Sequence, residues 1–202
     1  EKAFSFYNNI NVKFDIIEFC LKPLANNYTR LGDVDRAEDI LKITIEKAQK
    51  QNNTTQIIAG YSNLAVVFRT KGEYSKAINY LNLGLNLTTE KEIKARIYSD
   101  LAIHFLYLNE VEKAKENIQL SNKYNVGNNS SISTKNKITL ANCFVKNKNF
   151  DKAIIQFENA LKAAKITFGE YDREVAKIYN QIAEVYSKTN QIEKGLIYYQ
   201  KA

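Results

Sequence analysis

Several residue types are scarce in this chain of 202 residues, and each scarcity excludes a class of protein or site. Seven glycines and one proline are too few for a sandwich or barrel, which needs many turns between short strands. Two cysteines and one histidine provide neither a structural zinc site nor a disulfide framework. No apolar run approaches the roughly 18 residues of a membrane-spanning helix, which predicts no membrane insertion. Together these scarcities favour a helical protein.

The chain also lacks the motifs of catalytic and cofactor sites. It has no phosphate-binding loop, no glycine-rich dinucleotide fingerprint and no nucleophile elbow. The lone histidine, His104, has no His or Cys at a helical spacing, which predicts a structural role. Carboxylate pairs such as Glu90 and Glu92 lie at expected turns and helix starts, where negative charge is favourable. We therefore predict that the chain is not an enzyme and holds neither a metal nor a cofactor.

The rest of the composition is that of a folded protein with an excess of positive charge. Hydrophobic residues make up 45% of the chain and charged residues 25%, and the net charge is +7. The first residues show no signal-peptide pattern, and we expect a cytoplasmic location.

One pattern recurs five times and decides the predicted fold. A large aliphatic residue is followed by alanine, two variable residues and an aromatic. A small residue follows nine positions later and a large apolar residue four positions after that. The small residues recur at intervals of 37 to 42 positions, so the repeat is about forty residues long. The aromatic and small residues of the copies are Tyr28 and Ala37, Phe68 and Ala77, Phe105 and Ala114, Phe144 and Ala153, and Tyr186 and Gly195.

Each copy predicts a pair of amphipathic helices. The aliphatic, alanine and aromatic positions form one apolar stripe on a first helix, and a short polar break follows. The small residue lies on the inner face of a second helix and lets the two backbones approach closely. Because one helix pair cannot bury its stripe alone, the pairs must stack. The expected fold is an all-α solenoid of antiparallel helix hairpins.

These residues resemble the tetratricopeptide repeat family over essentially the whole chain. Tyr61, Tyr98 and Tyr179 fill the bulky slot that opens the first helix in that family. The fifth copy is similar to the long repeats of kinesin light chain and its bacterial relatives, although Asp172-Arg173 replaces their usual His-Pro. The resemblance implies a right-handed α-solenoid, or superhelix.

Both ends of the chain fall inside the repeat pattern. Glu1-Lys2-Ala3 matches the sequence around the small residue of later copies, and Ala202 lies within the second helix of the fifth. We therefore expect a fragment of a larger protein whose array continues in one or both directions. The expected division of 1–202, a single solenoid, is the second helix of a partial repeat at 1–13, repeats at 14–52, 53–90, 91–128 and 129–168, and a truncated repeat at 169–202.

Two local features modify the expected helices. Pro23 predicts either that its helix begins near Lys22 or that the helix is kinked there. The segment 125–131 predicts a loop, with Ser131 or Ser133 as the N-cap of the next helix.

The resemblance also implies that the first helix of every repeat lines a concave groove. Among the 25 positions of that face, eight are basic and one is acidic, whereas the other 177 positions hold 21 residues of each sign. This asymmetry favours a groove that binds an acidic peptide. The alternative is a solvated face that keeps the protein soluble. The candidate groove residues are Lys22, Asn26, Arg30, Asn63, Arg69, Arg96, Ser99, Tyr107, Lys135, Asn142, Lys146, Lys177, Asn180 and Lys188.

Two narrower ligand classes fit the sequence less well. Some chaperone-binding members of the family hold a terminal carboxylate with basic and asparagine residues, and four of those places are filled here. Asp100 stands where the last basic residue is required, and its charge repels a carboxylate. Nucleic acid is disfavoured because the predicted groove holds only two aromatics, fewer than single-strand binders use. The four matching residues are Lys22, Asn26, Asn63 and Arg96.

The function implied by the resemblance is a non-catalytic scaffold that binds a peptide or partner protein. The alternative is a regulatory, sensor or substrate-recruiting region of a larger enzyme or transcription regulator. Bacterial arrays of this kind resemble those fused to caspase-like proteases, histidine kinases or helix-turn-helix domains. We expect a protein or peptide partner and no small-molecule substrate.

Overall fold

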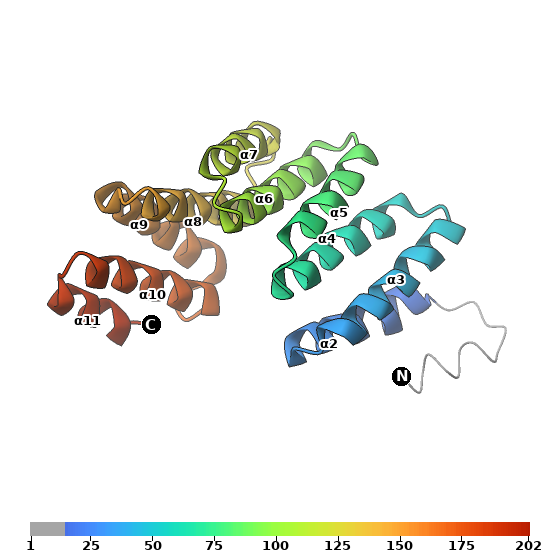
Figure 1. Ribbon diagram of the computed structural model, residues 1–202, viewed down its shortest axis with the longest axis horizontal. Helices are drawn as coiled ribbons and strands as arrows, with labels where there is room; N and C mark the ends of the chain where they lie inside the picture. Colours follow the sequence, from blue (N-terminus) through green and yellow to red (C-terminus); the bar gives the residue numbers. More distant parts are fainter. Residues whose placement is uncertain (1–14) are drawn as a thin grey trace. The chain divides into compact units, whose positions relative to one another are not determined.

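The predicted all-α fold is confirmed by the computed structural model, which describes residues 15–202 (Figure 1). Ten α-helices and a five-residue π-helix, η1, make up this part of the chain, and it contains no strand. The second helix expected at 1–13 lies outside the described residues. The elements are η1 (Ile17–Leu21), α2 (Lys22–Leu31), α3 (Val34–Lys50), α4 (Thr54–Thr70), α5 (Tyr74–Asn86), α6 (Lys91–Tyr107), α7 (Val111–Tyr124), α8 (Ser130–Lys146), α9 (Phe150–Phe168), α10 (Arg173–Lys188) and α11 (Ile192–Gln200).

The chain divides after Thr88 into two compact units. In the first unit, α2 packs on α3, α3 on α4 and α4 on α5. In the second unit, each helix from α6 to α11 packs on the next, and α6 also contacts α8. Short turns make consecutive helices antiparallel, so each unit is a stack of helix hairpins (Figure 1). The division into repeats at the residue numbers given above stays a prediction.

The small residue of each copy is buried where two helices meet. The four alanines in this position have no exposed surface. In the fifth copy, a Cβ added to Gly195 would lie 3.2 Å from the carbonyl oxygen of Ala183 in α10. The close backbone approach inferred from the sequence is therefore present. The alanines are Ala37, Ala77, Ala114 and Ala153.

The turn inside each hairpin has the same geometry in all five copies. The fourth residue after the aromatic has a positive φ, and the next N–H donates to the carbonyl of the aromatic at 2.8–2.9 Å. Glycine and asparagine adopt this conformation readily, whereas a lysine adopts it at a cost. The residues with positive φ are Gly32 (79°), Gly72 (77°), Asn109 (63°), Lys148 (55°) and Asn190 (59°).

A cation lies over the recurring aromatic in every copy, a contact that the sequence analysis does not predict. The cation belongs to the residue just before the small residue and is 5.5–5.9 Å from the ring centroid. The signal was present in the sequence, because all five small residues follow a lysine or an arginine. The pairs are Arg36 and Tyr28, Lys76 and Phe68, Lys113 and Phe105, Lys152 and Phe144, and Lys194 and Tyr186.

The two local expectations have different outcomes. The α-helix that contains Pro23 begins at Lys22, as expected, and η1 leads directly into it. The predicted cap of α8 is wrong, because the helix begins earlier, at Ser130. Its N-cap is Asn129, whose side chain accepts hydrogen bonds from the N–H groups of Ser131 and Ile132.

Candidate functional site

The candidate groove residues lie on the first helices of the hairpins, as the sequence predicts. Five of them lie on α2 and α4 of the first unit, and nine lie on α6, α8 and α10 of the second. Thirteen are exposed or half-buried. Ser99 departs from the expectation because it is only 1% exposed, so its hydroxyl cannot meet a ligand at the surface.

Four of the candidate cations already have acidic partners. Three of these pairs join residues on the same or adjoining helical turns at the surface. The fourth joins Lys135 of α8 to Asp100 of α6 and so links two first helices of the second unit. A neighbouring carboxylate cancels much of the field that each cation offers to a ligand. These three pairs are Lys22 of α2 with Glu18 of η1 (2.6 Å), Arg96 with Glu92 in α6 (3.7 Å), and Lys177 with Glu174 in α10 (2.5 Å).

The other four candidate cations, Arg30, Arg69, Lys146 and Lys188, have no ion pair within residues 15–202. They lie in the last turns of α2, α4, α8 and α10. This is the negative end of each helix dipole, where a cation is stabilised. In α6 the equivalent place holds Tyr107, which is 55% exposed. The uncompensated positive charge of the candidate site is therefore concentrated at the C-terminal ends of four first helices.

The positions that hold a terminal carboxylate in chaperone-binding members do not form a cluster of unpaired basic residues in this chain. Lys22 is paired with Glu18, and Asp100 holds Lys135. Asn26 is exposed on α2, and Asn63 is half-buried on α4. Nothing in this arrangement replaces the basic residue that Asp100 displaces.

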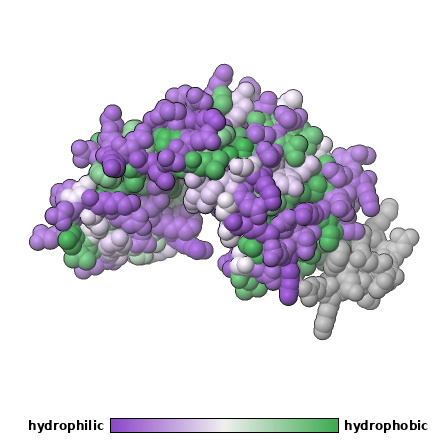
Figure 2. All heavy atoms as spheres, viewed as in Figure 1, coloured by the Kyte–Doolittle hydropathy of each residue, from purple (hydrophilic) through white to green (hydrophobic). Residues whose placement is uncertain are grey.

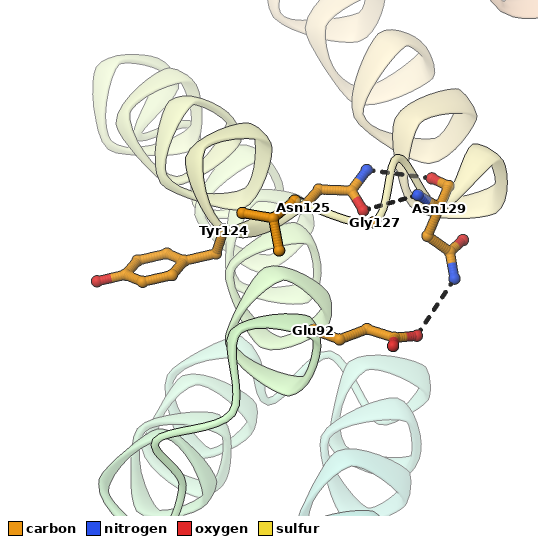
Figure 3. A pocket seen from close by; sticks show the side chains of 6 residues that line it. Glu92, Tyr124, Asn125, Gly127 and Asn129 are labelled. Atoms are coloured by element: carbon orange, nitrogen blue, oxygen red, sulfur yellow. Dashed lines mark hydrogen bonds between the residues drawn. The ribbon is translucent and has the colours of Figure 1, made fainter.

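The surface of both units is largely hydrophilic in the view of Figure 2, with hydrophobic side chains scattered among polar ones. A pocket of about 140 Å³ lies between the start of α6 and the loop after α7 (Figure 3). Its polar groups bond to one another: Asn125 Nδ2 donates to the carbonyl of Asn129 at 3.1 Å, and Asn129 Nδ2 donates to Glu92 at 3.4 Å. The Tyr124 ring points away from these groups (Figure 3). These polar groups are hydrogen-bonded to one another, and none of them is a nucleophile.

His104 and Cys143 are buried in the second unit, whereas Cys20 is half-buried in the first. His104 is 2% exposed, and its Nδ1 lies 2.7 Å from the carbonyl oxygen of Asp100. Burial raises the pKa of the Cys143 thiol to about 11, so the group is protonated at neutral pH. Among the residues that the structure describes, no cluster of His, Cys, Asp and Glu could hold a metal ion. No helix in the same part of the chain has both the length and the apolar character needed to cross a membrane.

Comparisons with known proteins agree with this repeat geometry. The profile of the tetratricopeptide repeat family matches residues 131–202. KINESIN LIGHT CHAIN-RELATED 1 of Arabidopsis thaliana is 22% identical over 181 residues, which cover 89% of this chain and 24% of that protein. The crystal structure of BtubC (BKLC) from P. vanneervenii has a TM-score of 0.68 at 20% identity and covers 83% of this chain and 71% of that one. The apo form of RapI has a TM-score of 0.73 at 14% identity and covers 99% of this chain and 86% of that one.

At these identities the solved structures establish the fold. Proteins built from such repeats are generally scaffolds that bind other proteins or peptides. A helical repeat protein is indicated by the recurring aromatic and small residues, by the hairpin stacks and by the family match. Residues 131–202 therefore match the tetratricopeptide repeat family, and the chain as a whole is similar in sequence and fold to kinesin light chain-like proteins.

Proposed function

We propose that this chain is a non-catalytic scaffold that binds an acidic peptide or an acidic segment of a partner protein. The ligand meets the first-helix face of a unit, where Arg30 and Arg69 provide the attraction in the first unit and Lys146 and Lys188 in the second. A cytoplasmic location is part of the same proposal. The observation that supports this proposal is the position of these four cations. They have no acidic partner within residues 15–202, and each lies in the last turn of the first helix of a hairpin.

The remaining candidates contribute less attraction in this proposal. Lys135 would have to leave Asp100 before it could hold a ligand carboxylate, and the exchange of one carboxylate for another gains little. The amides of Asn26, Asn142 and Asn180 can donate to the backbone carbonyls of an extended peptide without adding charge. The exposed ring of Tyr107 offers an apolar contact beside the cations.

A competing explanation is that a cation in the last turn only stabilises its own helix. The proposal is separated from it by the binding of a fluorescently labelled oligoglutamate peptide, followed by anisotropy at low salt. We expect the double variant Lys146→Glu/Lys188→Glu to weaken binding by about tenfold or more, because it replaces attraction with repulsion. The variant Arg30→Glu/Arg69→Glu tests the first unit in the same way.

The matched control is Lys123→Glu/Lys162→Glu, which changes the net charge equally. Both lysines are exposed on second helices, α7 and α9, and Lys123 also lies in a last turn. We expect the control to weaken binding by less than about threefold. Equal losses in the control and in the first-helix variants would show that only net charge matters, and the proposed site would be wrong.

A further inference from the structure

Buried polar side chains lie where the N-terminal half of α8 meets α6 and α7. Ser121 Oγ of α7 donates to the carbonyl of Ala95 in α6 at 2.7 Å. Asn136 Nδ2 of α8 donates to Ser121 Oγ and to Asn122 Oδ1, both at 2.8 Å. Of the nine polar residues that are buried within residues 15–202, seven lie between Ser99 and Thr139. We call Ser99, Ser121, Thr134 and Asn136 the polar seam.

The hydrogen bonds of the polar seam are incomplete. Asn136 Oδ1, Ser99 Oγ and Thr134 Oγ1 are buried and have no protein partner in the described part of the chain. All three residues are at most 2% exposed. A buried polar atom without a hydrogen bond has lost its hydration and gained nothing in return. The closed packing of this segment is therefore less favourable than an apolar contact of the same size.

Equivalent positions elsewhere in the chain show what a complete contact looks like. Between α9 and α10 the places of Ser121 and Asn136 are taken by Ala160 and Ile178, and both lie in a large apolar cluster. In α3 the place of Ser121 is taken by Thr44, whose hydroxyl donates to the carbonyl of Ile40 in its own helix at 2.7 Å. Neither position leaves a polar atom unpaired.

The C-terminal half of α8 is anchored differently from its N-terminal half. Cys143 and Leu140 pack with Ala102 and Ala114 in the apolar cluster between α6 and α7. On the other side of α8, Ala141 packs into the cluster shared with α9 and α10. One helix thus has an N-terminal half with buried, incompletely bonded polar side chains and a C-terminal half anchored by buried apolar side chains.

The loop before α8 is hydrogen-bonded to the first turn of α8. The Asn125 side chain donates to the carbonyl of Asn129 and accepts from the N–H of Asn129 (Figure 3). It also donates to Ser133 Oγ. These bonds tie the end of α7, the loop and the first turn of α8 together. The only side-chain link from this loop to α6 among the described hydrogen bonds is the exposed contact of Asn129 with Glu92.

We propose that residues 125–139, the loop and the polar half of α8, open as a unit while Leu140 and Cys143 stay packed. The unpaired atoms of the polar seam regain hydration in the open form, which lowers the cost of opening. Opening also carries Lys135 away from Asp100, because the two lie on α8 and α6. Opening of this segment would therefore switch Lys135 between its ion pair with Asp100 and solvent.

Hydrogen exchange of the whole chain, read by mass spectrometry at peptide resolution, tests this proposal without any ligand. In the wild-type protein we expect amides of 132–139 to exchange about tenfold or more faster than amides of 175–185 in α10. The variant Asn136→Ile/Ser121→Ala gives the seam the residue types found between α9 and α10. It should slow exchange at 132–139 by about tenfold, since apolar contact replaces unpaired polar atoms. The matched control Thr44→Ala, at the place of Ser121 in α3, should leave exchange at 132–139 unchanged.

A second variant keeps the test decisive if the first disturbs the fold. Ser99→Ala/Thr134→Val removes two unpaired hydroxyls with almost no change of shape, and it should slow the same amides. The proposal is overturned if 132–139 exchange as slowly as 175–185 in the wild-type protein. It is also overturned if a folded seam variant, judged by circular dichroism, leaves their exchange unchanged.

Discussion

Replacing Phe157 by alanine should lower the free energy of unfolding of the second unit by about 3–5 kcal/mol. Phe157 lies four residues after the small residue of its repeat, and it is the largest side chain that is completely buried in the described chain. It packs in one apolar cluster with Ala160, Ile178 and Ile182. Truncation would remove the ring and leave a cavity that α9 and α10 cannot close without losing their own contacts.

The repeat supplies a control at the same position. Tyr199 is the equivalent residue of α11, yet it is 44% exposed. Tyr199→Ala should therefore cost less than about 1 kcal/mol. Urea unfolding followed by far-ultraviolet circular dichroism measures both variants. Equal losses of unfolding free energy in the two variants would contradict the idea that burial makes this repeat position stabilising.

Replacing Gly60 by leucine should destabilise the first unit by about 2–3 kcal/mol. Gly60 is buried in α4, and a Cβ at this position would lie 2.5 Å from Cγ1 of Ile45 in α3. That distance is far below van der Waals contact, so a larger side chain requires Ile45 to shift or α3 and α4 to separate. The measurement is the urea midpoint of Gly60→Leu against the wild-type protein.

The clash itself can be isolated with a second substitution. Ile45→Ala alone should be destabilising, because it removes a buried side chain. In the double variant the leucine at 60 can fill the space that Ile45 leaves. We expect the double variant to be more stable than the sum of the two single losses implies. Strict additivity would show that the two positions do not compete for the same space.

The repeat architecture is readable from the sequence because it depends on residue types that recur at a fixed spacing. The aromatic and small residues of the five copies predict the hairpins, and the structure places each small residue at a helix contact. The turn geometry is also visible in the sequence, since the fourth residue after the aromatic is Gly or Asn in four copies. In the remaining copy this position is Lys148, and a lysine in a sequence does not predict a left-handed conformation.

The candidate site was less predictable, because it depends on which neighbours a side chain meets. A count of charges on the first-helix face does not include the acids one turn away that pair with Lys22, Arg96 and Lys177. The position of Ser99 on its helix predicts a surface residue, whereas the structure buries it. Such three-dimensional neighbours are set by the stacking of hairpins, which sequence spacing alone does not resolve.

The central claim is that the ligand of the first-helix face is acidic. The most direct measurement is selection of displayed random peptides on the immobilised whole chain, with no assumption about the partner. We predict that the selected peptides carry a net negative charge and lose binding to Lys146→Glu/Lys188→Glu. Selection of neutral or basic peptides would contradict the claim, and so would acidic peptides that bind this variant as tightly as the wild-type protein.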